Sequence, residues 1–149
     1  MLRYLLAASL LLGLTFATAH ADDKDGWKTI FDGKSMDGWK ISEPEKGSWK
    51  LDDGALIAKG ERSHIFYVGE EKPFKNFALD LEVQTKKNSN GGIYFHTKFQ
   101  ESGWPAQGHE CQVNNTYNSD PQKTASVYKV KKILDAPAKD DEWFKYTIT

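Results

Sequence analysis

Hydrophobic and polar residues alternate with a period of two along much of the chain, whereas helical periodicity is nearly absent after residue 21. The clearest case lies between residues 74 and 85, where Leu79, Leu81 and Val83 alternate with Asp80 and Glu82. This pattern is typical of a strand with one face on the core and the other in water. Strands are expected at residues 28–31, 48–52, 55–59, 64–68, 74–85, 92–100, 109–114, 126–130 and 144–149.

Turn dipeptides separate these strands, and Asp53-Gly54 between two apolar runs favours a two-residue hairpin. About nine short strands, with no internal repeat, predict an all-β, antiparallel jelly-roll sandwich. A barrel is the alternative, because periodicity does not separate the two. The chain ends at Thr149 inside an expected strand, so we expect a domain that lacks its C-terminal portion.

The first 21 residues have the pattern of a secretory signal peptide. Arg3 precedes an apolar run over residues 5–16, and the small-residue pattern Ala19-His20-Ala21 follows. A transmembrane anchor is the competing interpretation, but it needs about 20 apolar residues, more than this run supplies. We therefore expect a signal peptide at 1–21, a single domain at 22–149, export to the periplasm or the medium, and no membrane span in the mature protein.

Composition narrows the choice of partner and the role of the lone cysteine. Lys and Arg number 20 and Asp and Glu 21, so there is no basic excess of the kind that nucleic acid or anionic membranes attract. Cys111 is the only cysteine, so an intramolecular disulfide is impossible and the fold must rest on its hydrophobic core. We expect Cys111 to pack as a small buried hydrophobe rather than act as a reactive thiol.

Polar and aromatic residues concentrate on two expected neighbouring strands. Alternation puts Tyr94 and His96 on one face of the first strand, and Glu110, Gln112 and Asn114 on one face of the second. Antiparallel pairing would collect all five on a single face. Such a face suits a sugar, because aromatic rings stack on its C–H groups and amides bond its hydroxyls. An ordinary solvated sheet face is the alternative.

Further candidates lie outside these strands. Trp104, in a loop flanked by Gly and Pro, is expected either to stack on a sugar or to anchor the loop. Tyr128 could reach the same polar face or simply pack. Glu110 with His96 could hold a divalent metal ion, but two ligands without a recognised spacing leave the cofactor undefined.

A second acid is missing from the expected sugar-facing strand. Glycosidases generally use two carboxyl groups, whereas the positions two and four after Glu110 carry the amides Gln112 and Asn114. One carboxylate suffices when the reaction begins by removing a proton that a neighbouring carbonyl makes acidic. A sugar oxidised to a ketone at C3 has such a proton at C2, and elimination of the C1 substituent then breaks the glycosidic bond.

The chain resembles the 3-keto-disaccharide hydrolase domain family, a concanavalin-like jelly-roll. The resemblance is carried, in order, by "IFDGKSMDGW" (30–39), "WKLDDGALIAKG" (49–60), "FKNFALDLEVQTKKNSNGGIYFHT" (74–97), "GHECQV" (108–113), "TASVYKV" (124–130) and "EWFKYTIT" (142–149). It implies a two-sheet sandwich whose concave face accepts a 3-keto-glycoside, cleaved by elimination and hydration.

The resemblance also assigns residues. Glu110 and Gln112 match the family's "G-x-E-x-Q" strand, and Asn88 lies in the turn that approximates the family's asparagine-serine-glycine turn. Two departures from the family pattern occur: His96 stands where many members have Arg, and Asn114 and Asn115 stand where many have Asp shortly after the Gln. The first hypothesis is an exported enzyme.

In the enzyme hypothesis, Glu110 acts as the base and His96 as the acid or oxyanion stabiliser. The expected substrate contacts are Tyr94, Gln112, Asn114, Trp104, Tyr128 and Asn88. The second hypothesis is a noncatalytic carbohydrate-binding module on the same fold. A third, weaker one is an adhesion or structural sandwich. Neither the oligomeric state nor the glycan follows from the sequence.

Overall fold

The computed structural model describes residues 26–44 and 49–149, so the expected signal peptide lies outside the described residues. No α-helix occurs in these ranges, and nothing in them forms a helix long and apolar enough to cross a membrane. The strands are β1 (Trp39–Ile41), β2 (Trp49–Asp52), β3 (Ala55–Ala58), β4 (Ile65–Tyr67), β5 (Leu79–Val83), β6 (Gly91–Phe95), β7 (His109–Val113) and β8 (Phe144–Ile148).

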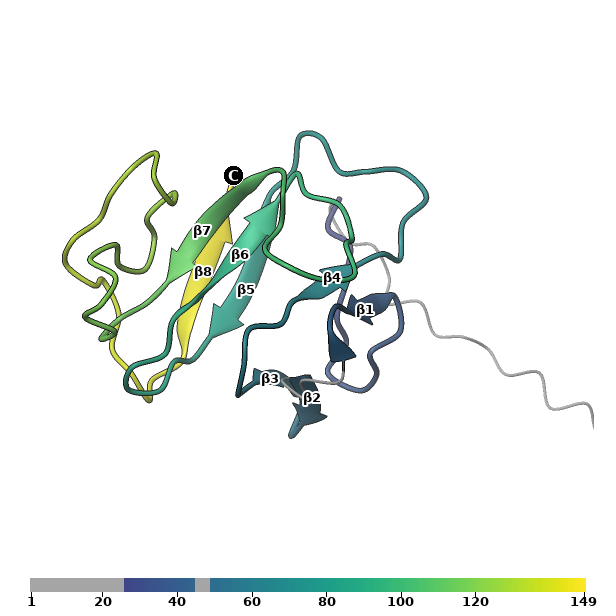
Figure 1. Cartoon of the computed structure of the whole chain (residues 1–149). Coiled ribbons are helices and arrows are strands. Elements are labelled where there is room, and N and C mark those ends of the chain that lie inside the picture. The colour runs from purple at the N-terminus through teal and green to yellow at the C-terminus, as the bar shows by residue number, and fades with distance from the viewer. Residues whose placement is uncertain (1–25, 45–48) are drawn as a thin grey trace, which may run out of the picture.

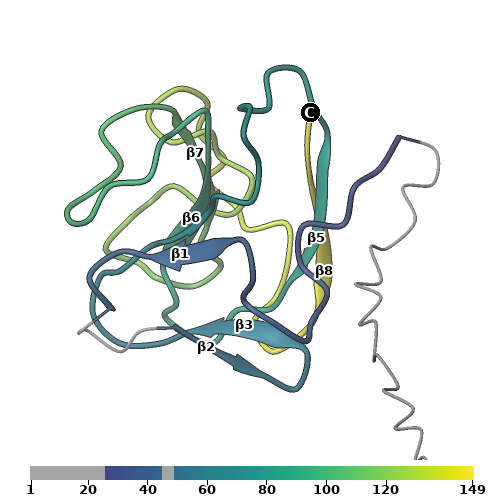
Figure 2. The same ribbon diagram turned by 90° about the vertical axis from the view of Figure 1, so that its right-hand side faces the viewer.

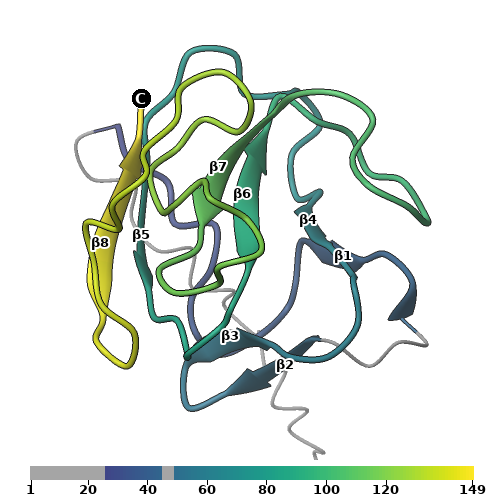
Figure 3. The same ribbon diagram turned by 60° about the vertical axis from the view of Figure 1, so that its left-hand side comes forward.

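The strands form four antiparallel pairs, which are β1 with β4, β2 with β3, β5 with β8, and β6 with β7. Figure 1 shows β5, β6, β7 and β8 running alongside one another, and Figure 2 separates them into a β5–β8 layer and a β6–β7 layer. In Figure 3, β1 and β4 lie on the far side of β6–β7 from β5–β8. The expected all-β, antiparallel sandwich fold is thus confirmed.

The core lies between the β5–β8 and β6–β7 layers. Cys111, Tyr146 and Ile148 are its buried members. Side chains from both layers surround them, namely Leu79, Leu81, Val83, Ile93, Phe95, Val113 and Phe144. Burial raises the pKa of the Cys111 thiol, which disfavours the reactive thiolate. The expectation that Cys111 packs as a small hydrophobe is therefore confirmed.

Most of the expected strands exist, with shorter bounds. Asp53 and Gly54 both have positive φ, 46° and 75°, as a type I′ hairpin between β2 and β3 requires. The long strand expected over 74–85 is reduced to β5, and residues 28–31 do not form a strand. Residues 126–130 make only isolated bridges through Val127, and the short strand β1 was not anticipated.

The connection between β6 and β7 extends across to the β1–β4 pair (Figure 1). Its Phe99 ring packs edge-on against Phe66 of β4 at 5.4 Å, and the Lys40 ammonium of β1 lies 3.8 Å from the centre of the same ring. The backbone amide of Glu43 also donates to the Glu101 carbonyl at 3.0 Å. These contacts hold the loop beside the outer face of β6–β7.

Candidate functional site

The face of β6–β7 that points away from the core carries the candidate site. Tyr94 and Glu110 are direct cross-strand partners, and the Tyr94 hydroxyl donates a hydrogen bond to Glu110 Oε2 at 3.0 Å. On the opposite face, Ile93 and Cys111 are also partners and enter the core. The predicted pairing of the two strands, with Tyr94 and Glu110 on one face, is confirmed.

Gly92 makes room for the Glu110 side chain. A Cβ atom at position 92 would overlap the carboxylate, with Glu110 Cδ only 2.7 Å away. The end of the Glu110 side chain therefore lies directly over Gly92 of the neighbouring strand. Glycine is required at this position by the close approach, not by its backbone angles.

The surroundings of Glu110 change its acidity. Burial raises the pKa of the carboxyl group above its usual value, the hydrogen bond from Tyr94 acts in the opposite direction, and the nearby Asp120 charge raises it. Burial, with the Glu110 charge, also raises the pKa of the Tyr94 hydroxyl. Tyr94 thus remains a hydrogen-bond donor, and Glu110 is a stronger base than a solvated glutamate.

Gln112 supports this carboxylate from a buried position, with a relative exposure of 1%. Its Nε2 donates to Asn90 Oδ1 at 2.9 Å and to Asp120 Oδ2 at 3.4 Å. With the amide rotated by 180°, its nitrogen donates to Glu110 Oε1 at 3.3 Å and to the Gly91 carbonyl at 3.1 Å. In both orientations the buried Gln112 amide bonds neighbouring protein groups, which differs from the direct substrate contact that the sequence suggested.

A second carboxylate, which the sequence analysis missed, lies close to Glu110. Asp120 Oδ1 accepts the Gln122 backbone amide at 2.9 Å, and a side-chain hydrogen bond to Asp120 raises the pKa of the Tyr128 hydroxyl. The Tyr128 backbone amide donates to the Glu110 carbonyl at 2.8 Å, so Tyr128 lies beside the site, which is one of the two arrangements expected for it. Asp120 comes from a loop without periodicity, and only its position before Pro121 marked it as a turn residue.

His64, next to β4, brings the β6–β7 loop into the site. Its ring meets Tyr94 edge-on at 6.1 Å and Trp104 at 5.5 Å. Trp104 is 61% exposed, and the Arg62 guanidinium lies 5.6 Å from its ring. The structure therefore places Trp104 near the Glu110 face, and adds His64 and Arg62, which showed no distinguishing sequence pattern.

Asn114 is not on the accessible face, and that expectation is wrong. The side chain is fully buried, and its Nδ2 donates to the carbonyls of Tyr117, Asp120 and Gln122 at 3.2, 3.1 and 3.0 Å. Its Oδ1 accepts the Tyr117 amide at 2.9 Å. The strand has already ended at Val113, so the short amide organises the loop that follows.

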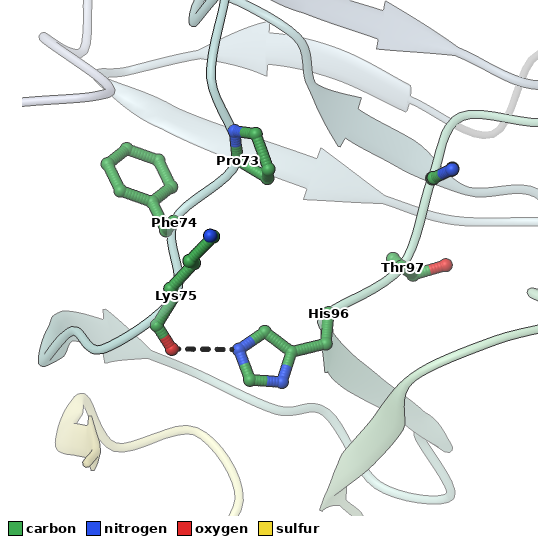
Figure 4. Close-up of a pocket in the computed structure, with 6 residues that line it drawn as sticks. Pro73, Phe74, Lys75, His96 and Thr97 are labelled. Atoms are coloured by element: carbon green, nitrogen blue, oxygen red, sulfur yellow. Dashed lines mark hydrogen bonds between the residues drawn. The ribbon is translucent and has the colours of Figure 1, made fainter.

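His96 does not share a face with Tyr94, contrary to prediction. Strand β6 ends at Phe95, and His96 has a φ of 55°, which breaks the alternation. Its ring meets Phe77 at 5.8 Å and Phe95 at 5.3 Å, and Nε2 lies 3.1 Å from the Lys75 carbonyl (Figure 4). The proposed role of His96 as acid therefore loses its geometric basis.

A shallow, open depression of about 310 Å³ adjoins His96. Its lining residues, most of them shown in Figure 4, are Pro73, Phe74, Lys75, His96, Thr97 and Lys98. None of the residues on the Glu110 face belongs to this lining.

Asn88 is also outside the group around Glu110. It adopts a φ of 64° in the turn between β5 and β6, and its backbone amide donates to Thr116 Oγ1 at 2.9 Å. The turn residue that does reach the site is Asn90, through Gln112. Over residues 26–44 and 49–149, no group of three or more His, Cys, Asp or Glu side chains is arranged to hold a metal ion.

These features define an antiparallel β-sandwich domain whose β6–β7 pair carries a polar face with the Glu110 carboxylate. The model of the 3-keto-alpha-glucoside-1,2-lyase-like domain matches residues 26–149, and the chain belongs to this family. A relative, the 3-keto-disaccharide hydrolase of Bacteroides thetaiotaomicron, is 32% identical over 81 residues. That match covers 49% of this chain and only 28% of the relative.

Proposed function

We propose that this protein cleaves the glycosidic bond of 3-keto-glycosides by elimination followed by hydration, with Glu110 as the base. The observation that carries the proposal is the Glu110 carboxylate, placed over Gly92 and bonded by Tyr94. Family membership and the name of the relative support the substrate class.

In the proposed reaction, Glu110 removes the C2 proton, which the C3 ketone makes acidic. The electron pair first forms the enolate and then the C1–C2 double bond, while the C1–O bond breaks. The proton held by Glu110 passes to the departing oxygen. Water then adds across the double bond, its oxygen to C1 and a proton to C2, which yields the free 3-keto sugar.

The surroundings of Glu110 fit these steps. A raised pKa makes the carboxylate a better base, and Tyr94 fixes its orientation through one oxygen. With its amide rotated, the buried Gln112 donates a hydrogen bond to the other oxygen of Glu110, Oε1. His96 has no part in this scheme, because its ring contacts Phe77 and Phe95 instead.

A carbohydrate-binding module without catalysis is the second candidate. The exposed Trp104 beside His64 and Tyr94 favours it, because such an aromatic platform binds sugars without any chemistry.

Turnover of a 3-keto-glucoside in D₂O tests the proposal and separates the two candidates. Wild-type protein should release 3-keto-glucose with deuterium at C2 above the level of an enzyme-free control. The Glu110→Gln variant should lose this activity, while Glu142→Gln, at an exposed position, should keep it. Release of product without C2 deuterium would indicate direct displacement, and sugar binding without turnover would indicate the module.

We further propose that the mature protein acts after export, in the periplasm or the medium. The support is Arg3, the apolar run after it and the small-residue pattern that ends at Ala21. Detection of a mature N-terminus at Asp22 in an exported fraction would test this.

A further inference from the structure

We propose that Trp104, His64 and Arg62 form a second sugar subsite, which takes the neutral pyranose ring that leaves from C1 of the substrate. This inference rests on the proposed function, because it places the oxidised ring over Glu110 and the departing ring over Trp104. Neither His64 nor Arg62 was expected to take part in the site.

The first argument is position. Trp104 is separated from Tyr94 by one intervening ring, since His64 contacts Tyr94 at 6.1 Å and Trp104 at 5.5 Å. Because Tyr94 bonds Glu110 directly, two rings, those of Tyr94 and His64, lead from the reacting position to Trp104. A disaccharide that presents one ring to Glu110 therefore extends its other ring toward Trp104.

The second argument is that an exposed indole is held on an ordered loop. The Gln100 amide nitrogen donates to the Ser102 and Trp104 carbonyls at 2.8 and 2.6 Å, and its oxygen accepts the Ala106 amide at 3.0 Å. Trp104 nevertheless remains 61% exposed. A large aromatic surface that is both fixed and open is prepared to stack on a ligand at little cost in entropy.

The third argument concerns charge and hydrogen bonding. Arg62 is paired with the Glu43 carboxylate at 3.3 and 3.5 Å, so its charge is already offset and the subsite suits a neutral ligand. His64 Nδ1 is buried without a hydrogen-bond partner, and burial lowers the pKa of this imidazole. The offset charge of Arg62 and the neutral form of His64 that burial favours both suit a neutral ligand.

A pair of tryptophan variants provides the test. Trp104→Ala is compared with Trp143→Ala, because Trp143 is similarly exposed, at 57%, but is in the segment that leads into β8. Each protein is assayed with a 3-keto-disaccharide and with methyl 3-keto-glucoside, which lacks the second ring. Trp104→Ala should reduce the ratio of kcat/KM for the disaccharide to kcat/KM for the methyl glucoside about tenfold. Trp143→Ala should not change this ratio.

Titration with unoxidised cellobiose, followed through the indole N–H signals by NMR, separates failure of the subsite from failure of the proposed function. The Trp104 signal should shift on addition of cellobiose, and Gln100→Ala should weaken that binding. If no protein turns over either substrate but the Trp104 signal shifts, the result supports the subsite and contradicts the enzymatic function. An unchanged kcat/KM ratio in Trp104→Ala overturns the subsite. Indole N–H signals of Trp104 and Trp143 that respond equally to cellobiose also overturn it.

Discussion

The Glu110 carboxylate lies over Gly92 in space that any other side chain at position 92 would occupy. The close approach joins two residues that are 18 positions apart in the sequence, a glycine of β6 and the acid of β7. The position of Glu110 therefore depends on the absence of a Cβ atom on the neighbouring strand as much as on its own strand.

Gly92→Ala should reduce kcat about a hundredfold with little loss of stability. The atoms in the way belong to the flexible end of Glu110, which can swing aside without disturbing the backbone, but displacement of a reacting group by about 1 Å costs a factor of that order. Gly91→Ala is the matched control, because a Cβ there meets nothing within 4 Å. Equal effects of the two variants on kcat and on thermal unfolding would contradict this prediction.

Tyr94→Phe should shift the acidic limb of the kcat/KM profile to higher pH. The Tyr94 hydrogen bond lowers the pKa of Glu110, so its loss raises that pKa and leaves less of the ionised base at any pH near it. Tyr67→Phe is the control, because its hydroxyl makes a comparable bond to Glu70 at 3.1 Å outside the site. An unchanged limb in Tyr94→Phe would show that another group governs the profile.

Glu110→Gln should be more stable than the wild-type protein at pH 8, and the advantage should shrink toward pH 4. Folding raises the pKa of Glu110 above its usual value of 4.5. The stability linked to its protonated form is therefore fully present below about pH 4.5. That stability is lost as the pH rises through the folded pKa, whereas glutamine never ionises. Urea unfolding at several pH values measures the difference, and a constant difference would exclude this linkage.

Asn114→Ala should lower the free energy of unfolding by about 3 kcal/mol, because buried carbonyls of the following loop lose their donor. Asn118→Ala, on the exposed part of that loop, should change it by no more than about 0.5 kcal/mol. Denaturant titration compares the two. If Asn114 were a substrate contact, its variant would instead keep its stability and lose only affinity.

His96→Asn should retain most of the wild-type activity. Asparagine tolerates the positive φ at this position, and the imidazole contacts Phe77 and Phe95 rather than Glu110. Steady-state assays alongside Glu110→Gln provide the comparison. A loss of activity as large as that of Glu110→Gln would restore His96 to the reaction.

The pattern of the sequence was sufficient where local geometry decides the outcome. The period of two placed Leu79, Leu81 and Val83 on the core side of β5, and the Asp53-Gly54 dipeptide set the β2–β3 hairpin. The pairing of Tyr94 with Glu110 followed from the same alternation in two consecutive strands. Alternation gave a wrong position for His96 because the strand ends one residue earlier.

By itself, the sequence determined the all-β class, the packing of Cys111 and the single acid on its strand. These follow from side-chain periodicity and residue type, which act over a few positions. Only the tertiary structure decided that Asp120 and His64 approach Glu110 and Tyr94, and that Asn114 is buried in loop hydrogen bonds. Such contacts join loops to strands distant in the chain, and they depend on how separate sheets pack, which no local pattern encodes.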